Sequence, residues 1–326
     1  MKLKYSVFLG NVGHCFDRYC PEYSKPFSLA ELFDRAATIK QLDAVDLVMD
    51  WGMMEKKEEI KAHLARTGLK VGSLAVDTFA NPLYKKGSLS STEPAVRDRA
   101  LKDAKAVIDF AAELGCKIVT LWPGQDGYDY IFAADYMRER QLFRDEVEEL
   151  CRYNPDVIIT LEYKIKEPRT HSYISTVGAT LLMIEKIGLP NCGIALDYGH
   201  AALGYETAAE AVAMCKMYGD RLKHIHINDN YRLWDDDMIV GTVHTLEYLE
   251  FFYWLKRTGY NGYLVIDQFP YREDGRDAVA ESAEWLDALQ EAADRIDDAE
   301  AREVLSKRDG VAASKFMRKI LFGGNR

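Results

Sequence analysis

Residues 191–230 read NCGIALDYGHAALGYETAAEAVAMCKMYGDRLKHIHINDN, and this stretch contains the repeating unit that decides the fold. A short apolar run, Cys192–Asp197, predicts a strand, and a second apolar run, Lys223–Asn228, predicts the next strand. The segment between them, Thr207–Tyr218, has a helical pattern. It opens with a Thr followed three residues later by Glu210, which is the spacing of a capping box. A strand, a helix and a strand in this order are typical of a parallel sheet.

The same alternation extends over the whole chain. Six further apolar runs predict strands: Lys4–Leu9, Ala44–Met49, Leu69–Val76, Lys117–Trp122, Asp156–Glu162 and Tyr263–Asp267. Helical patterns separate or follow them: Phe27–Lys40, Glu55–Thr67, Glu93–Leu114, Ala133–Arg152, Ser175–Ile187, Thr245–Arg257 and Ala278–Arg295. The first of these helices opens with Ser28 and Glu31, a second capping box. Eight such units favour an α/β fold of the (β/α)₈ TIM-barrel type over an open doubly wound sheet. No Gly-x-Gly-x-x-Gly turn follows the first strand, which also disfavours the open sheet.

No linker rich in Pro, Gly or Ser divides the chain, so we expect one barrel domain over residues 1–297. Residues 298–326 are rich in Ala, Glu, Lys and Arg and predict a short helical C-terminal extension. Two roles for this tail remain open at this point: it caps the barrel, or it forms an interface with a neighbouring subunit.

Composition narrows the class of protein. Of the 326 residues, 48% are hydrophobic and 29% are charged, which fits a globular protein with a sizeable core. The formal net charge of -10 argues against nucleic acid as a partner, because binding phosphates needs a basic face. We expect no membrane segment and no signal peptide, since no apolar run is long enough. Six scattered cysteines predict free thiols, and the expected location is the cytoplasm.

Four potential metal ligands lie at the ends of the last four predicted strands. They are Glu162, Asp197, His226 and Asp267. Each has an ordinary structural alternative, such as an ion pair, a helix cap or a buried core histidine. Because the carboxyl ends of barrel strands meet at one rim, the four together predict a metal site. Three carboxylates and one imidazole favour Mn²⁺, with Mg²⁺ or Co²⁺ as alternatives, over Zn²⁺.

A second set of ligands lies beside the first. His200 follows Asp197 by three residues, and Asp235 and Asp237 follow the seventh predicted strand. Acids two residues apart in an extended segment point the same way, so these residues could hold a second ion, with Asp197 bridging the two. A solvated run of charge is the alternative for the three acids at 235–237. The sequence therefore predicts one or two ions per chain.

The pattern resembles the xylose isomerase-like TIM barrels over nearly the whole predicted barrel. Within that group it is most similar to the two-metal aldose–ketose isomerases of the L-rhamnose isomerase type. The resemblance rests on Leu-Glu-Tyr-Lys at 161–164, Leu-Asp-x-Gly-His at 196–200, His-x-Asn-Asp at 226–229, Asp-Asp-Asp at 235–237 and an aspartate at 267.

The resemblance implies roles for both sets of ligands. Glu162, Asp197, His226 and Asp267 would hold a structural ion. A catalytic ion would be held by Asp197, His200, Asp235 and Asp237. It also implies a substrate-contacting pair, His14 and Phe16, after the first strand.

Further residues are candidates for the pocket. Lys164 lies two residues after Glu162, so it faces the same side and can donate to a sugar oxygen; an ion pair with Glu162 or Asp197 is the alternative. Trp122 and Trp51 follow strands and could cover the C–H face of a sugar, or pack in the core. Arg169 and His171, after the fifth strand, could contact substrate or fix their loop. We expect His224 on the opposite face of its strand from His226.

The leading functional hypothesis is a metal-dependent isomerase that interconverts an aldose and a ketose. We expect catalysis to depend on Glu162, Lys164, His200 and Asp267. A ketose 3-epimerase of the same superfamily is a close alternative. A metal-dependent lyase, such as a dehydratase or a C-glycoside-cleaving enzyme acting on an oxidised sugar, is another. We disfavour a DNA-repair endonuclease and a non-catalytic binding barrel. The expected partner is a small sugar, and we expect a homo-oligomer, a dimer or a tetramer.

Overall fold

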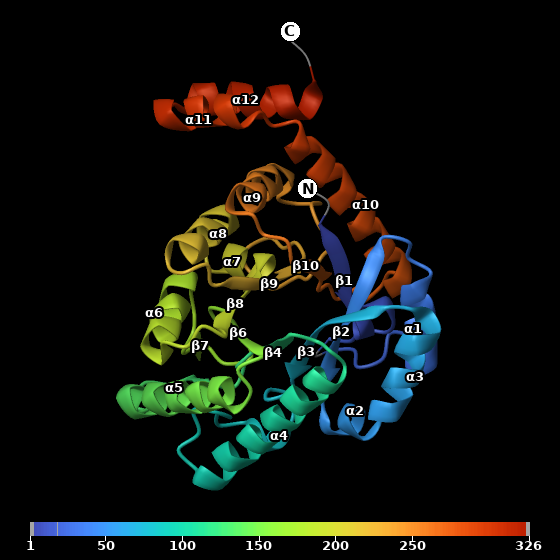
Figure 1. Ribbon diagram of the computed structural model, residues 1–326, viewed down its shortest axis with the longest axis vertical. Coiled ribbons are helices and arrows are strands. Elements are labelled where there is room, and N and C mark those ends of the chain that lie inside the picture. The colour runs from blue at the N-terminus through green and yellow to red at the C-terminus, as the bar shows by residue number, and fades with distance from the viewer. Residues whose placement is uncertain (1–2, 18, 324–326) are drawn as a thin grey trace.

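A computed structural model describes residues 3–17 and 19–323, and its centre is a closed barrel of eight parallel strands. The order around the barrel is β1-β10-β9-β8-β6-β4-β3-β2. The predicted strands are all present, as β1 (Lys4–Phe8), β2 (Leu42–Met49), β3 (Lys70–Val76), β4 (Ile118–Leu121), β6 (Ile158–Glu162), β8 (Cys192–Asp197), β9 (Leu222–Ile227) and β10 (Tyr263–Ile266). The TIM-barrel prediction is therefore confirmed (Figure 1).

Helices surround the barrel on its outside (Figure 1). The eight expected helices appear as α1 (Leu29–Ala37), α3 (Lys57–Thr67), α4 (Pro94–Glu113), α5 (Tyr136–Tyr153), α6 (Val177–Ile187), α8 (Ala208–Met217), α9 (Thr245–Thr258) and α10 (Gly275–Asp294). The capping box of Ser28 and Glu31 is present at the start of α1. At the start of α8, by contrast, the Thr207 side chain makes no capping hydrogen bond to any described residue, so that expectation was wrong.

Several short elements add to the predicted pattern. They are η1 (Leu9–Val12), α2 (Trp51–Glu55), η2 (Pro82–Tyr84) and α7 (Tyr198–Leu203), together with a ribbon of β5 (Gly127–Tyr128) and β7 (His171–Ser172). The ribbon is antiparallel and joins the loop after β4 to the loop after β6. Elements of two to six residues are too short to show a hydrophobic period, so the sequence did not predict them.

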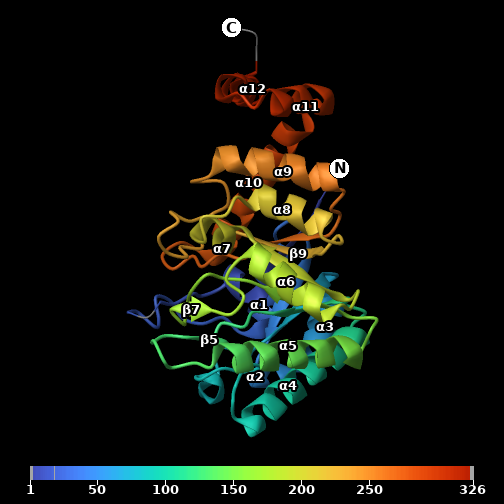
Figure 2. The ribbon, with the colours of Figure 1, turned by 90° about the vertical axis from the view of Figure 1, so that its left-hand side faces the viewer.

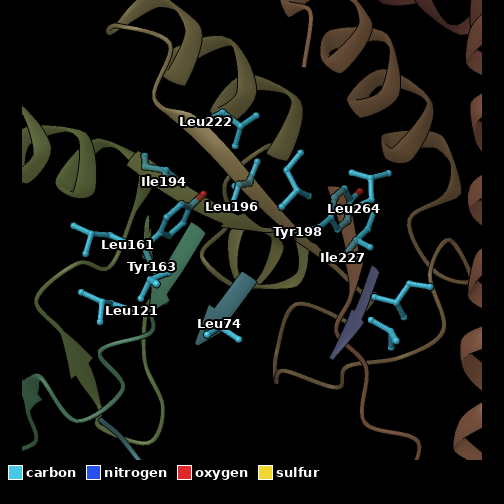
Figure 3. Close-up of a cluster of buried hydrophobic side chains, with 14 of the residues drawn as sticks. Leu74, Leu121, Leu161, Tyr163, Ile194, Leu196, Tyr198, Leu222, Ile227 and Leu264 are labelled. Atoms are coloured by element: carbon cyan, nitrogen blue, oxygen red, sulfur yellow. The ribbon is translucent and has the colours of Figure 1, made fainter. Parts of the chain in front are cut away.

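Most of the core consists of apolar side chains from the strands and the surrounding helices. Figure 3 shows part of this core, including Leu74, Leu121, Leu161, Ile194, Leu196, Ile227 and Leu264, all of which are fully buried. Such side chains hold the strands in register, and the register in turn places the residues at the strand ends.

The interior of the barrel also contains a polar layer, formed by Ser6, Asp46, Ser73, Thr120, Thr160 and His224. Asp46 accepts hydrogen bonds from the hydroxyls of Ser6 and Ser73, and its Oδ2 lies 2.8 Å from Nε2 of His224. Since β2 and β9 are not neighbours in the barrel, the contact between Asp46 and His224 crosses the interior. A polar layer is unusual where barrels normally stack branched apolar side chains.

The C-terminal extension forms two helices, α11 (Asp298–Lys307) and α12 (Gly310–Phe322). They stand off from the barrel beyond α9 and α10 (Figure 2). Within the described part of this extension, Ala301 and Ile320 are the buried residues of the two helices. No helix in residues 3–17 or 19–323 is long and apolar enough to cross a membrane.

Candidate metal centre and active site

Four side chains converge at the carboxyl end of the barrel. Glu162 ends β6, Asp197 ends β8, His226 lies near the end of β9, and Asp267 follows β10. One potential ligand atom from each lies within 4.8 Å of the others. Glu162, Asp197 and His226 are buried, and Asp267 is partly exposed. The sequence predicted that these four residues meet, and the structure brings them together.

The register of the strands explains why they meet. Asp197 on β8 pairs with His226 on β9, so the two side chains lie next to each other at the rim. Glu162 on β6 pairs with Ala195, two residues before Asp197. The backbone N–H of Asp267 donates to the carbonyl of Ile227 at 3.1 Å, which extends the pairing of β10 with β9. Each potential ligand therefore occupies a position that backbone hydrogen bonds define.

His226 lies among the carboxylates of this group. Its Nδ1 is 3.2 Å from Oε1 of Glu162 and 3.7 Å from Oδ2 of Asp267. Even so, among the described residues neither ring nitrogen has a partner in hydrogen-bonding geometry. Buried polar atoms are rarely left unpaired. Three carboxylates around an unpaired imidazole nitrogen fit a divalent cation, because the cation would satisfy all four groups at once.

The pKa shifts of these four residues reflect the excess of negative charge among them. Burial lowers the pKa of His226, but Glu162 and the two aspartates outweigh it and raise that pKa to about 10. Burial raises the pKa of Asp267 to about 7, against the opposing charge of His226. Burial also raises the pKa of Asp197. For Glu162, burial raises the pKa, yet the charge of His226 reverses the direction and leaves it lowered.

The second predicted set of ligands is arranged differently. His200 Nε2 lies 3.0 Å from Oδ2 of Asp235, and the backbone N–H of His200 donates to Oδ1 of Asp197 at 2.7 Å. Burial lowers the pKa of His200, but Asp197 and Asp235 outweigh it and raise it to about 9. No group of three or more potential ligands within 4.8 Å includes Asp235 or Asp237 in the described part of the chain. The residues proposed for a second ion are thus near each other but not preassembled.

Lys164 occupies the space beside Asp235, one of the residues expected to hold the second ion. Lys164 Nζ lies 2.7 Å from Asp235 Oδ2 and 2.7 Å from Glu167 Oε2, and not against Glu162 or Asp197, the ion-pair partners considered as an alternative. Burial lowers the pKa of Lys164, but Asp235 and Glu167 outweigh it, so the net shift is upward and the amine stays protonated. Burial lifts the pKa of Asp237 well above its usual range, and the charge of Asp235 adds to this shift.

The structure treats the predicted substrate contacts Trp122, Phe16 and His14 differently. The ring of Trp122 is 5.2 Å from Lys164 Nζ, beside the charged cluster, and it packs against Phe79 at 4.6 Å. Phe16, in the loop that follows η1, is 59% exposed. His14 instead uses its Nδ1 to contact Ser24 Oγ at 2.8 Å.

Three other candidates are engaged elsewhere. Trp51 donates from Nε1 to Asp103 on α4 at 2.8 Å, so it packs on the outer helices and the proposed pocket contact lacks support. Arg169 pairs with Asp129 at 2.8 Å and fixes its loop. His171 lies in the ribbon, where its ring stacks on Tyr128 with 4.5 Å between centroids.

The expectation for His224 was wrong. Residues two apart on a strand share a face, so His224 points into the barrel like His226, and their ring centroids are 5.2 Å apart. His224, His226 and Asp46 form a second group with potential ligand atoms within 4.8 Å. The oxygens of Asp46 already accept hydrogen bonds from two serines, and one of them also lies within hydrogen-bonding distance of His224. Asp46 and His224 therefore belong to a hydrogen-bonded network below the rim, and His226 does not take part in it.

Sequence reasoning missed several polar residues around the ligands. Asn228 donates its amide to Asp197 Oδ2 at 3.1 Å, and the Asn11 amide contacts Asp267 Oδ1 at 3.4 Å. Glu167 forms an ion pair with Lys164. The motif His-x-Asn-Asp contained a signal for Asn228, because a buried amide next to a ligand usually orients it. No local pattern marked Asn11 or Glu167.

The chain as a whole matches a known family. A family model described as the xylose isomerase-like TIM barrel matches residues 33–289, so the chain belongs to that family. Xylose isomerase from the bacterium Thermus thermophilus is 28% identical over 225 residues, which are 67% of this chain and 58% of that protein. The chain therefore matches less than two thirds of that relative's length.

Solved structures give the same fold. A D-tagatose 3-epimerase-like protein superposes with a TM-score of 0.69 and 19% identity, covering 89% of this chain and 99% of that chain. A D-allulose 3-epimerase from Methylomonas sp., solved in complex with D-allulose, has a TM-score of 0.67 and 18% identity, covering 88% and 97%. At these identities the likeness establishes the fold alone.

Proposed function

We propose that the protein is a metal-dependent sugar isomerase that interconverts an aldose and a ketose. The observation that carries this proposal is the group of Glu162, Asp197, His226 and Asp267, with ligand atoms within 4.8 Å at the barrel rim. The family membership supports action on a sugar. The oxygen-rich donor set of these four residues favours Mn²⁺, with Mg²⁺ or Co²⁺ as alternatives. We propose that each chain binds one or two ions.

The bound ion would polarise the sugar carbonyl and lower the pKa of the adjacent hydroxyl. The chain's own residues do the rest. Lys164 is protonated and can donate from Nζ to a sugar oxygen. His200 can hold a proton at Nε2, where Oδ2 of Asp235 lies 3.0 Å away and can accept the hydrogen bond. Trp122 offers an apolar face to the C–H side of the sugar and helps to exclude water.

The reaction itself is balanced without a co-reactant. One hydrogen moves from C2 to C1 and one proton moves from O2 to O1. The C–H hydrogen either travels with its electron pair or is removed and returned as a proton by a carboxylate such as Glu162 or Asp267.

A ketose 3-epimerase is the second candidate. It is favoured by the position of Glu162 and Asp267, whose oxygens lie 3.2 and 3.7 Å from the same His226 nitrogen and so could act as a pair. The shorter arm of Asp267 and the adjacent Lys164, Asp235 and His200 favour the isomerase. A lyase acting on an oxidised sugar stays as the third candidate, because it would begin with the same enolisation.

The test is a panel of aldoses and ketoses incubated in D₂O with Mn²⁺-loaded protein and followed by proton NMR. A C1/C2 isomer without deuterium supports a hydride-shift isomerase, and a C1/C2 isomer with deuterium supports the enediol route. Deuterium at C3 with inverted configuration establishes the epimerase instead. Chelator-treated protein is the control, and no turnover of any free sugar would overturn both readings in favour of the lyase.

A further inference from the structure

Asn228 is a fully buried amide that reaches from β9 to a residue on the neighbouring strand. It directly follows Ile227, the last residue of β9. Its Nδ2 donates to Asp197 Oδ2 at 3.1 Å and approaches Oδ1 at 3.4 Å. Asn228 therefore touches one member of the four-residue ligand group without belonging to that group.

The place of this amide is fixed from several sides. The hydroxyl of Tyr248 donates to the backbone carbonyl of Asn228. A Cβ at Gly199 would overlap Oδ1 of Asn228, so only glycine leaves room for the amide at this point. Asn230 then holds the same segment by donating from Nδ2 to the Gly199 carbonyl at 2.9 Å. The Gly in Leu-Asp-x-Gly-His and the Asn in His-x-Asn-Asp therefore pack directly against each other.

Asp197 needs such a contact because its carboxylate has more than one task. Its Oδ1 accepts the backbone N–H of His200 and caps α7. A cap alone fixes one oxygen and leaves the carboxylate free to rotate about that bond. The Asn228 amide fixes the second oxygen, and it does so without bringing another positive charge next to a cation.

The amide also carries a cost that packing does not require. Its Oδ1 is buried and has no hydrogen-bond partner among the residues that the structure describes. Burying half of an amide unpaired is unfavourable, and a leucine of similar shape would avoid it. The contact with Asp197 is the compensating interaction that the geometry offers.

We infer that Asn228 is a positioning residue that holds Asp197 in the orientation needed to bind a divalent cation, and that Gly199 is required to admit it. The inference rests on the metal site of the proposed function. It adds a residue that acts on the ion through Asp197 rather than by touching it.

The test measures Mn²⁺ affinity, from the electron paramagnetic resonance signal of the free ion, for Asn228→Leu and Asn228→Ala. Loss of a contact of this kind weakens metal affinity by about 10- to 100-fold. The matched control is Asn191→Leu. Asn191 is a buried amide just before β8 whose Nδ2 donates to the carbonyls of Cys151 and Val157, both at 2.9 Å. The control should unfold at a lower temperature yet keep the wild-type affinity.

A double-mutant cycle separates positioning from general damage. In an Asp197→Asn background, Asn228→Ala should weaken Mn²⁺ binding no further, because there is no carboxylate left to hold. Gly199→Ala should reproduce the loss seen in Asn228→Ala.

Three outcomes would contradict either the inference about Asn228 or the proposed function, and they can be distinguished. Wild-type affinity in both Asn228 variants overturns the inference and leaves the proposed function standing. An equal loss in Asn191→Leu reduces the effect to stability and also overturns the inference. If the unaltered protein binds no divalent ion, the proposed function itself fails.

Discussion

At the scale of single residues, His226 balances the charge of the site. Three carboxylates surround it, and its pKa is raised to about 10 by Glu162 and the aspartates despite burial. A proton on this ring and a divalent ion compete for the same negative charge. Loading the site with an ion must therefore displace that proton.

Replacing His226 with Ala should abolish tight ion binding. We expect Mn²⁺ affinity to fall by more than about 100-fold, since a ligand matters at least as much as the residues that orient it. Isothermal titration calorimetry measures this directly. His63→Ala on α3 is the control, because His63 lies outside the strand ends that form the site and stacks on Phe33 of α1. Unchanged affinity in His226→Ala would remove this residue from the ligand set.

Lys164→Met should separate chemistry from ion binding. The variant keeps the length of the side chain and removes the donor, so we expect kcat to fall by about 100-fold or more. Mn²⁺ affinity should hold or increase, because a cation has been removed from the neighbourhood of Asp235. Steady-state kinetics on the sugar identified by NMR, together with calorimetry, give both values. A loss of affinity with unchanged kcat would contradict the role proposed for Lys164.

At the scale of elements, the short ribbon of β5 and β7 ties two rim loops together. The loop after β4 carries Trp122, and the loop after β6 carries Lys164 and Glu167. Their separation therefore depends on the pairing of Gly127 with Ser172.

Gly127→Val should break this pairing. A side chain at Gly127 would overlap the backbone carbonyl of His171, which has no flexible end to move aside. We expect kcat/KM to fall by about tenfold through a higher KM, because positioning of the substrate is lost before chemistry. Gly178→Ala, at a helix position with open space around it, is the control. Equal kinetics in the two variants would show that the ribbon does not support the site.

The sequence predicted long elements well and local geometry poorly. The ends of the strands at Glu162 and Asp197 were predicted correctly because their apolar runs are continuous, although the first strand begins two residues later than predicted. The shared rim of the barrel then brings the potential ligands together. By contrast, the pairing of Lys164 with Asp235 and the packing of Trp51 on Asp103 join loops and helices distant in sequence. No periodic pattern encodes such contacts. The error at His224 had another cause: residues two apart on a strand share a face, and the prediction placed His224 and His226 on opposite faces.

At the scale of the whole molecule, α11 and α12 project from the barrel with little buried surface of their own (Figure 2). Helices of this length are marginal without packing partners. We propose that the protein works in the cytoplasm as a homo-oligomer, a dimer or a tetramer, and that this extension takes part in the contact.

Deleting residues 298–326 should leave the barrel folded and dissociate the assembly. We expect the melting temperature of the barrel to change by less than about 4 °C, the shift that roughly 1 kcal/mol produces in a domain of this size. Light scattering coupled to size-exclusion chromatography reports the mass, and calorimetry reports whether Mn²⁺ still binds. An unchanged mass would move the subunit contact to another surface.

The capping of α7 by Asp197 has a consequence beyond the site. The oxygen that accepts the His200 N–H belongs to the same carboxylate that we propose as a ligand. Opening of the first helical turn and departure of the ion are then linked, and each must change the other's equilibrium by the same factor. The amide proton of His200 thereby becomes a built-in reporter: its exchange with deuterated solvent should slow as the ion binds, before any substrate is present.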